Sequence, residues 1–149
     1  DAIYTDEMTG AVLYTLRTRT LFPDEVAASC PYNIPRAAQD GTIAKCDMCN
    51  DRVHNGLEPA CVKTCPTGAM NFGDRNEILD LAERRLKTVQ KKYPGAALLD
   101  PDAVRVIFLV AFDPLLYHES AIASRSPLGM TRAMALRQMA KPFTNLMRL

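Results

Sequence analysis

The sequence has 149 residues, about the size of one domain. Its composition, 48% hydrophobic and 23% charged, is that of a globular chain and excludes a disordered or collagen-like one. Eighteen basic and 17 acidic residues leave a net charge of +1, and no basic stripe with interleaved aromatic residues supports nucleic-acid binding. The longest apolar runs are far shorter than the roughly 20 residues that cross a bilayer, so we expect no transmembrane segment.

The N-terminal part begins with a predicted β-hairpin. Residues 2–5 and 11–15 have strand-like compositions, and the turn-like residues 6–10 lie between them. Further on, Pro23 is followed by two acidic residues, which predicts the start of a short helix. Because the chain starts at Asp1, inside the hairpin, we expect it to be the C-terminal part of a longer protein. A processed N-terminus is the alternative.

The middle of the chain, residues 30–73, is rich in Pro and Gly, so we expect loops and short turns there, with a strand at residues 69–72. One clear helix is predicted over residues 75–93. Asp74 and Glu77 fit a capping box at its start, and apolar residues repeat every three or four positions along it. The repeat consists of Leu79, Ala82, Leu86, Val89 and Tyr93. We interpret this helix as covering a core, without a chemical role.

The C-terminal part begins with residues 104–112, whose β-branched and aromatic side chains predict a buried strand. From Ser120 onward there are five basic residues and no acid, interleaved with Met, Leu and Phe. We therefore divide the chain into a domain, residues 1–112, and a basic amphipathic tail, residues 113–149. The tail is expected on a partner subunit or a membrane surface; packing on its own domain, or partial disorder, is the equal alternative.

Five cysteines carry the strongest signal, because an odd number cannot form a complete set of disulfides. Four form the motif Cys46-x2-Cys49-x11-Cys61-x3-Cys65, and the fifth, Cys30, lies 16 residues upstream. Both Cys30 and Cys65 are followed directly by Pro. We take all five as candidate cofactor and metal ligands, and we find no paired acids or nucleophile–base set that would make a catalytic residue.

Three kinds of chemistry compete for this motif. Zinc ribbons use two C-x2-C pairs, which the C-x3-C-P ending fits poorly. A redox dithiol at Cys46 and Cys49 would need a helix start beside a βαβ unit, which we do not predict there. Bacterial ferredoxins, by contrast, end their [4Fe–4S] motif in C-x3-C-P, and the last Cys ligates the other cluster in two-cluster forms. The iron–sulfur interpretation is therefore favoured.

This ferredoxin rule distributes the ligands among several clusters. Cys46, Cys49 and Cys61 would serve one cluster, Cys65 a second, and Cys30 yet another. Each cluster would then lack ligands within the 149 residues, which agrees with a missing N-terminal half. The alternative is one cluster held by the four clustered cysteines, with Cys30 a buried thiol.

Three segments resemble the iron–sulfur subunits that accompany molybdopterin oxidoreductases such as dimethyl sulfoxide reductase, polysulfide reductase and formate dehydrogenase. They are CPYNIPR at residues 30–36, KCDMCNDRV at 45–53 and GLEPACVKTCPTGAM at 56–70. The resemblance extends over residues 1–112. It implies an α+β, bacterial ferredoxin-like fold, loop-rich with short strands, as the C-terminal part of a double ferredoxin.

The sequence departs from the usual cysteine pattern of these subunits at one place, and this departure indicates a particular group among them. In most of these subunits a complete C-x2-C-x2-C-x3-C-P run ends at the position of Cys30, but residues 25–29 contain no Cys. The loss of one cluster's ligands is similar to the small subunit of soluble heterodimeric tungsten or molybdenum formate dehydrogenases, which carry three [4Fe–4S] clusters. By this resemblance Cys30 closes a cluster begun in the missing half, and Cys65 completes the cluster built on the N-terminal motif.

The resemblance also implies a function. The subunit would relay electrons between a tungsten or molybdenum bis-pterin site in a catalytic partner and an external acceptor such as a c-type cytochrome. It would be periplasmic, exported with that partner; a cytoplasmic location is the alternative. Lys45, Arg52 and Lys63 flank the cysteines and could raise a cluster's potential, although solvated surface cations are the simpler interpretation. His54 is expected in an exposed polar loop.

Overall fold

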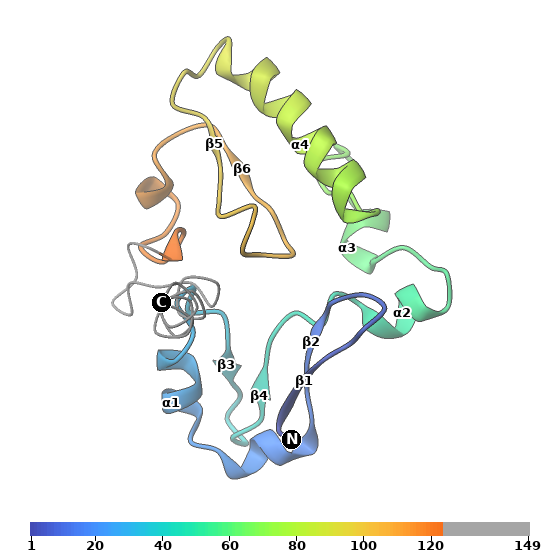
Figure 1. The fold of residues 1–149 in the computed structure, drawn as a ribbon. Coiled ribbons are helices and arrows are strands. Elements are labelled where there is room, and N and C mark those ends of the chain that lie inside the picture. Colours follow the sequence, from blue (N-terminus) through green and yellow to red (C-terminus); the bar gives the residue numbers. More distant parts are fainter. Residues whose placement is uncertain (124–149) are drawn as a thin grey trace, which may run out of the picture.

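The structure, a computed structural model, describes residues 1–123. Its strands form three separate two-stranded antiparallel sheets, and four short to medium helices and two 3₁₀ turns connect them (Figure 1). The strands are β1 (Ile3–Thr5), β2 (Val12–Tyr14), β3 (Arg36–Ala37), β4 (Ile43–Ala44), β5 (Ala97–Leu98) and β6 (Leu109–Val110). The helices are η1 (Leu16–Thr20), α1 (Pro23–Ala28), α2 (Asn50–His54), α3 (Ala60–Lys63), α4 (Arg75–Gln90) and η2 (Pro114–Leu116).

The N-terminal hairpin is confirmed. β1 pairs with β2 in a register that places Ile3 opposite Tyr14. The turn closes through a backbone hydrogen bond of 2.8 Å from Gly10 N to Asp6 O. Gly10 has a φ of +67°, a backbone conformation that favours glycine at this position.

The two helices predicted with defined starts are both present. α1 begins at Pro23, with acidic residues in its first turn, as expected from the sequence. α4 begins at Arg75, but it ends at Gln90, three residues before the predicted end. The predicted capping box is wrong, because the side chain of the N-cap residue Asp74 makes no capping hydrogen bond.

The apolar face of α4 is only half-buried, and no residue of the helix is fully buried. The helix lies beside β5 (Figure 1). Just beyond its end, the Tyr93 ring meets the Phe112 ring edge to face, with 5.2 Å between the centroids. α4 therefore covers a thin apolar layer.

The strand predicted over residues 104–112 is largely wrong. Only Leu109 and Val110 form β6, and Phe108 is 59% exposed. The Arg75 guanidinium, at the start of α4, donates to the carbonyl of Val104 at 2.9 Å and also to that of Pro101. These contacts fix the start of the segment, and the two-residue β5 offers a partner only to Leu109 and Val110.

The strand predicted over residues 69–72 is also wrong, and this segment is a loop. Two hairpins that were not predicted, β3–β4 and β5–β6, have strands of two residues, too short for a periodic signal. Residues 30–73, where no helix was predicted, also contain α2 and α3. The predicted tail is described only as far as residue 123, so most of it lies outside the described residues.

The core within residues 1–123 is small. No large side chain in these residues is fully buried, since each keeps at least 2% of its surface exposed to solvent. The buried apolar residues are Ala11, Ile43, Ala96, Leu99, Val110 and Ala123. None of the described helices is both long and apolar enough to span a membrane. The short strands and helices form an α+β arrangement in which hydrogen bonds, more than apolar packing, position the loops.

Candidate metal centre

The five cysteines lie on loops and helix ends, and all are free thiols. Cys30 follows α1, Cys46 and Cys49 bracket the loop before α2, Cys61 is on α3, and Cys65 lies two residues after α3. Cys46 and Cys61 are exposed, and the other three are half-buried. Within residues 1–123, no three His, Cys, Asp or Glu side chains lie close enough together to hold one metal ion.

The loop between Cys46 and Cys49 has an uncommon backbone conformation. Met48 and Cys49, neither of them glycine, have φ values of +60° and +50°. Two hydrogen bonds hold this conformation: Met48 N donates to Cys46 Sγ at 3.4 Å, and Cys49 N donates to Asp47 Oδ1 at 2.8 Å. Successive left-handed residues cost conformational energy and cluster at functional sites. Here they turn a backbone N–H toward a cysteine sulfur.

The loop after Cys65 also directs donors at sulfur. Met70 N donates to Cys65 Sγ at 3.5 Å, and the Thr67 hydroxyl lies at the same distance from it. The hydrogen bond from Thr67, followed by that from Met70, lowers the pKa of the Cys65 thiol to about 7. The loop therefore favours a thiolate, the form of cysteine that binds metals.

The loop after Cys30 is held from a distant part of the chain. The Tyr32 hydroxyl donates to Asp100 Oδ2 at 2.8 Å, across 68 positions of sequence. The same oxygen accepts a hydrogen bond of 3.0 Å from Ala123 N. Burial, and then the hydrogen bond to Asp100, raises the pKa of Tyr32. Sequence reasoning missed this link, because a contact across 68 positions leaves no local pattern in the sequence.

The three cations beside the motif differ from one another. Lys45 Nζ donates to the carbonyls of Val12 and Cys46 and lies 5.1 Å from the centre of the Tyr14 ring. Burial lowers its pKa, so Lys45 is not the solvated surface cation of the simpler interpretation. Arg52 Nε donates to the carbonyl of Glu58 at 2.8 Å. Lys63 is exposed, with no such contact described.

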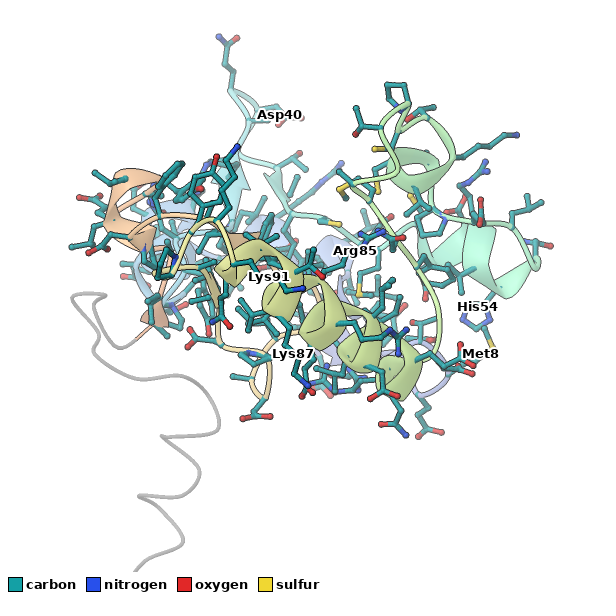
Figure 2. All side chains as sticks on the ribbon, turned by 90° about the horizontal axis from the view of Figure 1, so that it is seen from above. Met8, Asp40, His54, Arg85, Lys87 and Lys91 are labelled. Carbon is teal, nitrogen blue, oxygen red and sulfur yellow. The ribbon has the colours of Figure 1, made fainter. Side chains whose placement is uncertain are left out.

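His54 lies on α2, so the predicted loop position is wrong, although its side chain is 42% exposed as expected. Its Nε2 lies 3.0 Å from Asp6 Oδ1. Hydrogen bonds from Thr9 are the main reason that the pKa of Asp6 falls to about 2. The Thr9 hydroxyl also lies 2.8 Å from Asn50 Oδ1, so the β1–β2 turn contacts α2 directly after Cys49. Figure 2 shows Met8 of this turn beside His54 of α2.

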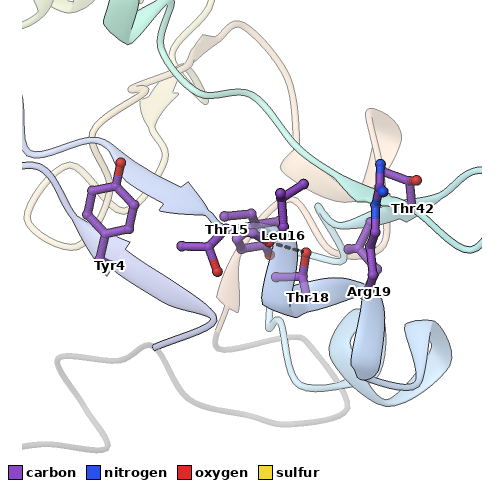
Figure 3. Close-up of a pocket in the computed structure, with 8 residues that line it drawn as sticks. Tyr4, Thr15, Leu16, Thr18, Arg19 and Thr42 are labelled. Atoms are coloured by element: carbon purple, nitrogen blue, oxygen red, sulfur yellow. Dashed lines mark hydrogen bonds between the residues drawn. The ribbon is translucent and has the colours of Figure 1, made fainter.

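A separate shallow cavity of about 380 Å³ lies against the N-terminal hairpin (Figure 3). It is lined by Tyr4, Tyr14, Thr15, Leu16, Thr18, Arg19, Thr42 and Ile43. No cysteine lines it, so we do not assign it to the metal centre.

The chemistry of the donor set fits a [4Fe–4S] cluster better than the alternatives. Structural zinc ribbons use two C-x2-C pairs, whereas the second pair here is the C-x3-C-P of Cys61 and Cys65. Each thiolate of a [4Fe–4S] cluster binds a different iron, so its ligands stay apart, and hydrogen bonds to sulfur tune the cluster. Cys49 does precede a helix, but the sheets within residues 1–123 are antiparallel hairpins, without the βαβ unit of a dithiol site. Cysteine-bearing loops with N–H groups directed at sulfur, together with the C-x3-C-P ending, are typical of iron–sulfur electron carriers.

Comparison with known proteins agrees with this class. Residues 1–75 match the family described as a 4Fe-4S dicluster domain, and the chain belongs to that family. It is 54% identical over 124 residues to formate dehydrogenase subunit beta of Megalodesulfovibrio gigas, which covers 82% of this chain and 58% of that protein. It is 49% identical over 124 residues to formate dehydrogenase 2 subunit beta (cytochrome c-553) of Nitratidesulfovibrio vulgaris, covering 80% and 57%.

A third relative is the nitrate-inducible formate dehydrogenase iron–sulfur subunit of Escherichia coli, 46% identical over 98 residues, with 61% of this chain and 33% of that protein covered. The predicted resemblance to iron–sulfur subunits of formate dehydrogenases is confirmed by these relatives. The chain spans 33% to 58% of their lengths.

Proposed function

We propose that this chain is part of the electron-transfer subunit of a formate dehydrogenase. It would carry electrons between a tungsten or molybdenum bis-pterin site in a catalytic partner and an external acceptor. The observation that carries the proposal is the pair of cysteine loops whose backbone N–H groups donate to Cys46 and Cys65 sulfur. Its membership of the 4Fe-4S dicluster family supports the same reading. The alternative is the same role in a dimethyl sulfoxide or polysulfide reductase.

The five cysteines would serve three [4Fe–4S] clusters, as in the C-terminal part of a double ferredoxin. Cys46, Cys49 and Cys61 would share one cluster with a cysteine outside these residues. Cys65 would complete a second cluster, and Cys30 a third. The C-x3-C-P ending supports this exchange of ligands.

Such a cluster, when bound, accepts and releases single electrons. The chain's own residues hold the thiolates and set their surroundings. Thr67 and Met70 donate to the Cys65 sulfur, which stabilises its negative charge. Lys45, fixed over Tyr14, holds a positive charge beside Cys46.

The proposed partners are the catalytic subunit, in a heterodimer, and a c-type cytochrome as acceptor. The second of these is supported by the name of the Nitratidesulfovibrio vulgaris relative, which mentions cytochrome c-553. The basic tail, residues 113–149, would contact the catalytic subunit, and residues 1–112 would form the cluster-binding domain. We propose a periplasmic location, with export alongside the catalytic subunit, and a cytoplasmic one as the alternative.

The test uses the complete complex, in which formate should reduce the clusters of this subunit, as followed by EPR. A Cys65→Ser variant should stop electron delivery to a cytochrome. Formate oxidation should remain unchanged when a small dye accepts the electrons directly at the catalytic subunit. Thr64→Ser, a change beside the same cysteine, is the matched control. If formate leaves the clusters oxidised while another substrate of a molybdopterin enzyme reduces them, the formate assignment is wrong. If Cys65→Ser transfers electrons normally, the relay is wrong.

A further inference from the structure

The loop that follows Cys65 is closed by one side chain that sequence reasoning did not single out. Asn71 Nδ2 donates to the carbonyl of Gly68 at 3.2 Å and to that of Ala69 at 3.1 Å. These carbonyls lie between Cys65 and Met70, whose N–H donates to the Cys65 sulfur. Asn71 therefore holds the backbone that aims a donor at the ligand.

The orientation of the Asn71 amide is fixed from its other end. Because its NH₂ group serves two carbonyls, its Oδ1 is left to accept a hydrogen bond. Arg85 Nη2, from α4, lies 3.4 Å from this oxygen. The Arg85 side chain extends toward the segment between α3 and α4, whereas Lys87 extends from the other side of the helix (Figure 2).

The electrostatic surroundings make this contact stand out. None of the contacts described for Arg85 within residues 1–123 is an ion pair with an acid. Arg85 is thus a cation without an acidic partner in the part of the chain that the structure describes, and a guanidinium stays protonated at every working pH. Reduction adds negative charge to a cluster, so a fixed cation and an N–H directed at sulfur both favour the reduced form.

We propose that Asn71 and Arg85 are positioning residues that raise the reduction potential of the cluster ligated by Cys65. Asn71 holds the Met70 N–H on the sulfur, and Arg85 fixes the Asn71 amide and adds a positive charge next to this loop. The inference rests on the proposed function, because it requires Cys65 to be a cluster ligand.

The test is an EPR-monitored redox titration of the complete, cluster-loaded complex. A Cys65→Ser variant first identifies the signal that belongs to this cluster. Asn71→Ala should then shift that signal alone to a lower potential, by about tenfold in the reduction equilibrium constant, which corresponds to 59 mV for a one-electron couple. Arg85→Gln should shift it in the same direction by about threefold, and Arg85→Lys by less, since the charge is kept.

Lys87→Gln is the matched control, because it removes a cation from the same helix without touching Asn71, and it should leave the potential unchanged. Arg85 is exposed, so its variants remain informative if Asn71→Ala fails to fold. If Cys65→Ser alters no signal, the ligand assignment in the proposed function is wrong. If it alters one signal, but neither Asn71→Ala nor Arg85→Gln moves the potential of that signal relative to Lys87→Gln, the inference alone is overturned.

Discussion

The Cys65 loop and the Cys30 loop contain the same Cys–Pro pair, and each cysteine is a proposed cluster ligand, but the chain supports the two loops in opposite ways. The Cys65 loop is built from within, since Thr67 and Met70 place their donors on the sulfur only two and five positions from the cysteine. The Cys30 loop is held from outside, by the Tyr32 hydroxyl on Asp100 across 68 positions. A short motif can therefore encode one ligand's surroundings locally, while an equivalent motif depends on the whole fold.

The largest effect in this comparison is expected at Asp100. Asp100→Ala removes the acceptor of both the Tyr32 hydroxyl and Ala123 N, and leaving part-buried donors unsatisfied should lower the free energy of unfolding by about 1–3 kcal/mol. Urea denaturation of the cluster-loaded subunit measures this change. Asp102→Ala, an exposed neighbour without described contacts, should change stability little.

The same variant separates the two loops spectroscopically. We expect Asp100→Ala to alter the EPR signal lost in Cys30→Ser and to leave the signal lost in Cys65→Ser unchanged. An equal change in both signals would show that Asp100 supports the whole domain and not the Cys30 loop.

A smaller effect is expected at Tyr32. Tyr32→Phe keeps the ring and removes only the hydroxyl, while Asp100 keeps its hydrogen bond from Ala123 N. The loss of one such hydrogen bond should lower the free energy of unfolding by about 1 kcal/mol. Tyr4→Phe, at a ring that is 49% exposed, is the control and should have no measurable effect. Matching urea midpoints for the two variants would mean that the hydrogen bond from Tyr32 to Asp100 does not stabilise the protein.

The smallest effect is local to the Cys65 loop. In the cluster-free chain, the Cys65 thiol should ionise with a pKa of about 7, so its alkylation rate should rise through that pH. Thr67→Val removes the largest cause of the low pKa and should move this profile to higher pH, with less thiolate at neutral pH. Peptide mass spectrometry reports alkylation at Cys65 alone.

Thr64→Val is the control for this measurement, because the Thr64 hydroxyl donates to the carbonyl of Ala60 and not to sulfur. Its alkylation profile should match that of the unmodified chain. A profile that moves equally in both variants would mean that Thr67 acts on the loop's fold and not on the Cys65 sulfur.

The difference between local and long-range support also explains which parts of the structure could be predicted from the sequence. The β1–β2 hairpin, the start of α1 at Pro23 and the body of α4 were predicted correctly, because each depends on neighbours a few positions away. The cysteine spacing alone likewise predicted an iron–sulfur protein, and the match to the 4Fe-4S dicluster family confirms that prediction.

The errors arose where distant residues decide the structure. The long strand predicted from residue 104 is reduced to Leu109 and Val110, which pair with β5, while Arg75, 29 positions earlier, binds the Val104 carbonyl. The strand predicted at residues 69–72 fails because the Asn71 amide closes a loop instead. For the same reason, the Tyr32–Asp100 contact left no readable pattern in the sequence.

The central claim, that these loops ligate [4Fe–4S] clusters shared with cysteines elsewhere in the subunit, is tested most directly by counting metal. Iron, zinc and acid-labile sulfide should be measured per complete subunit, purified anaerobically. We expect about twelve iron atoms with matching sulfide, which corresponds to three clusters. About four iron atoms would mean one self-contained cluster and would contradict the shared ligands, and zinc without iron would contradict electron transfer altogether.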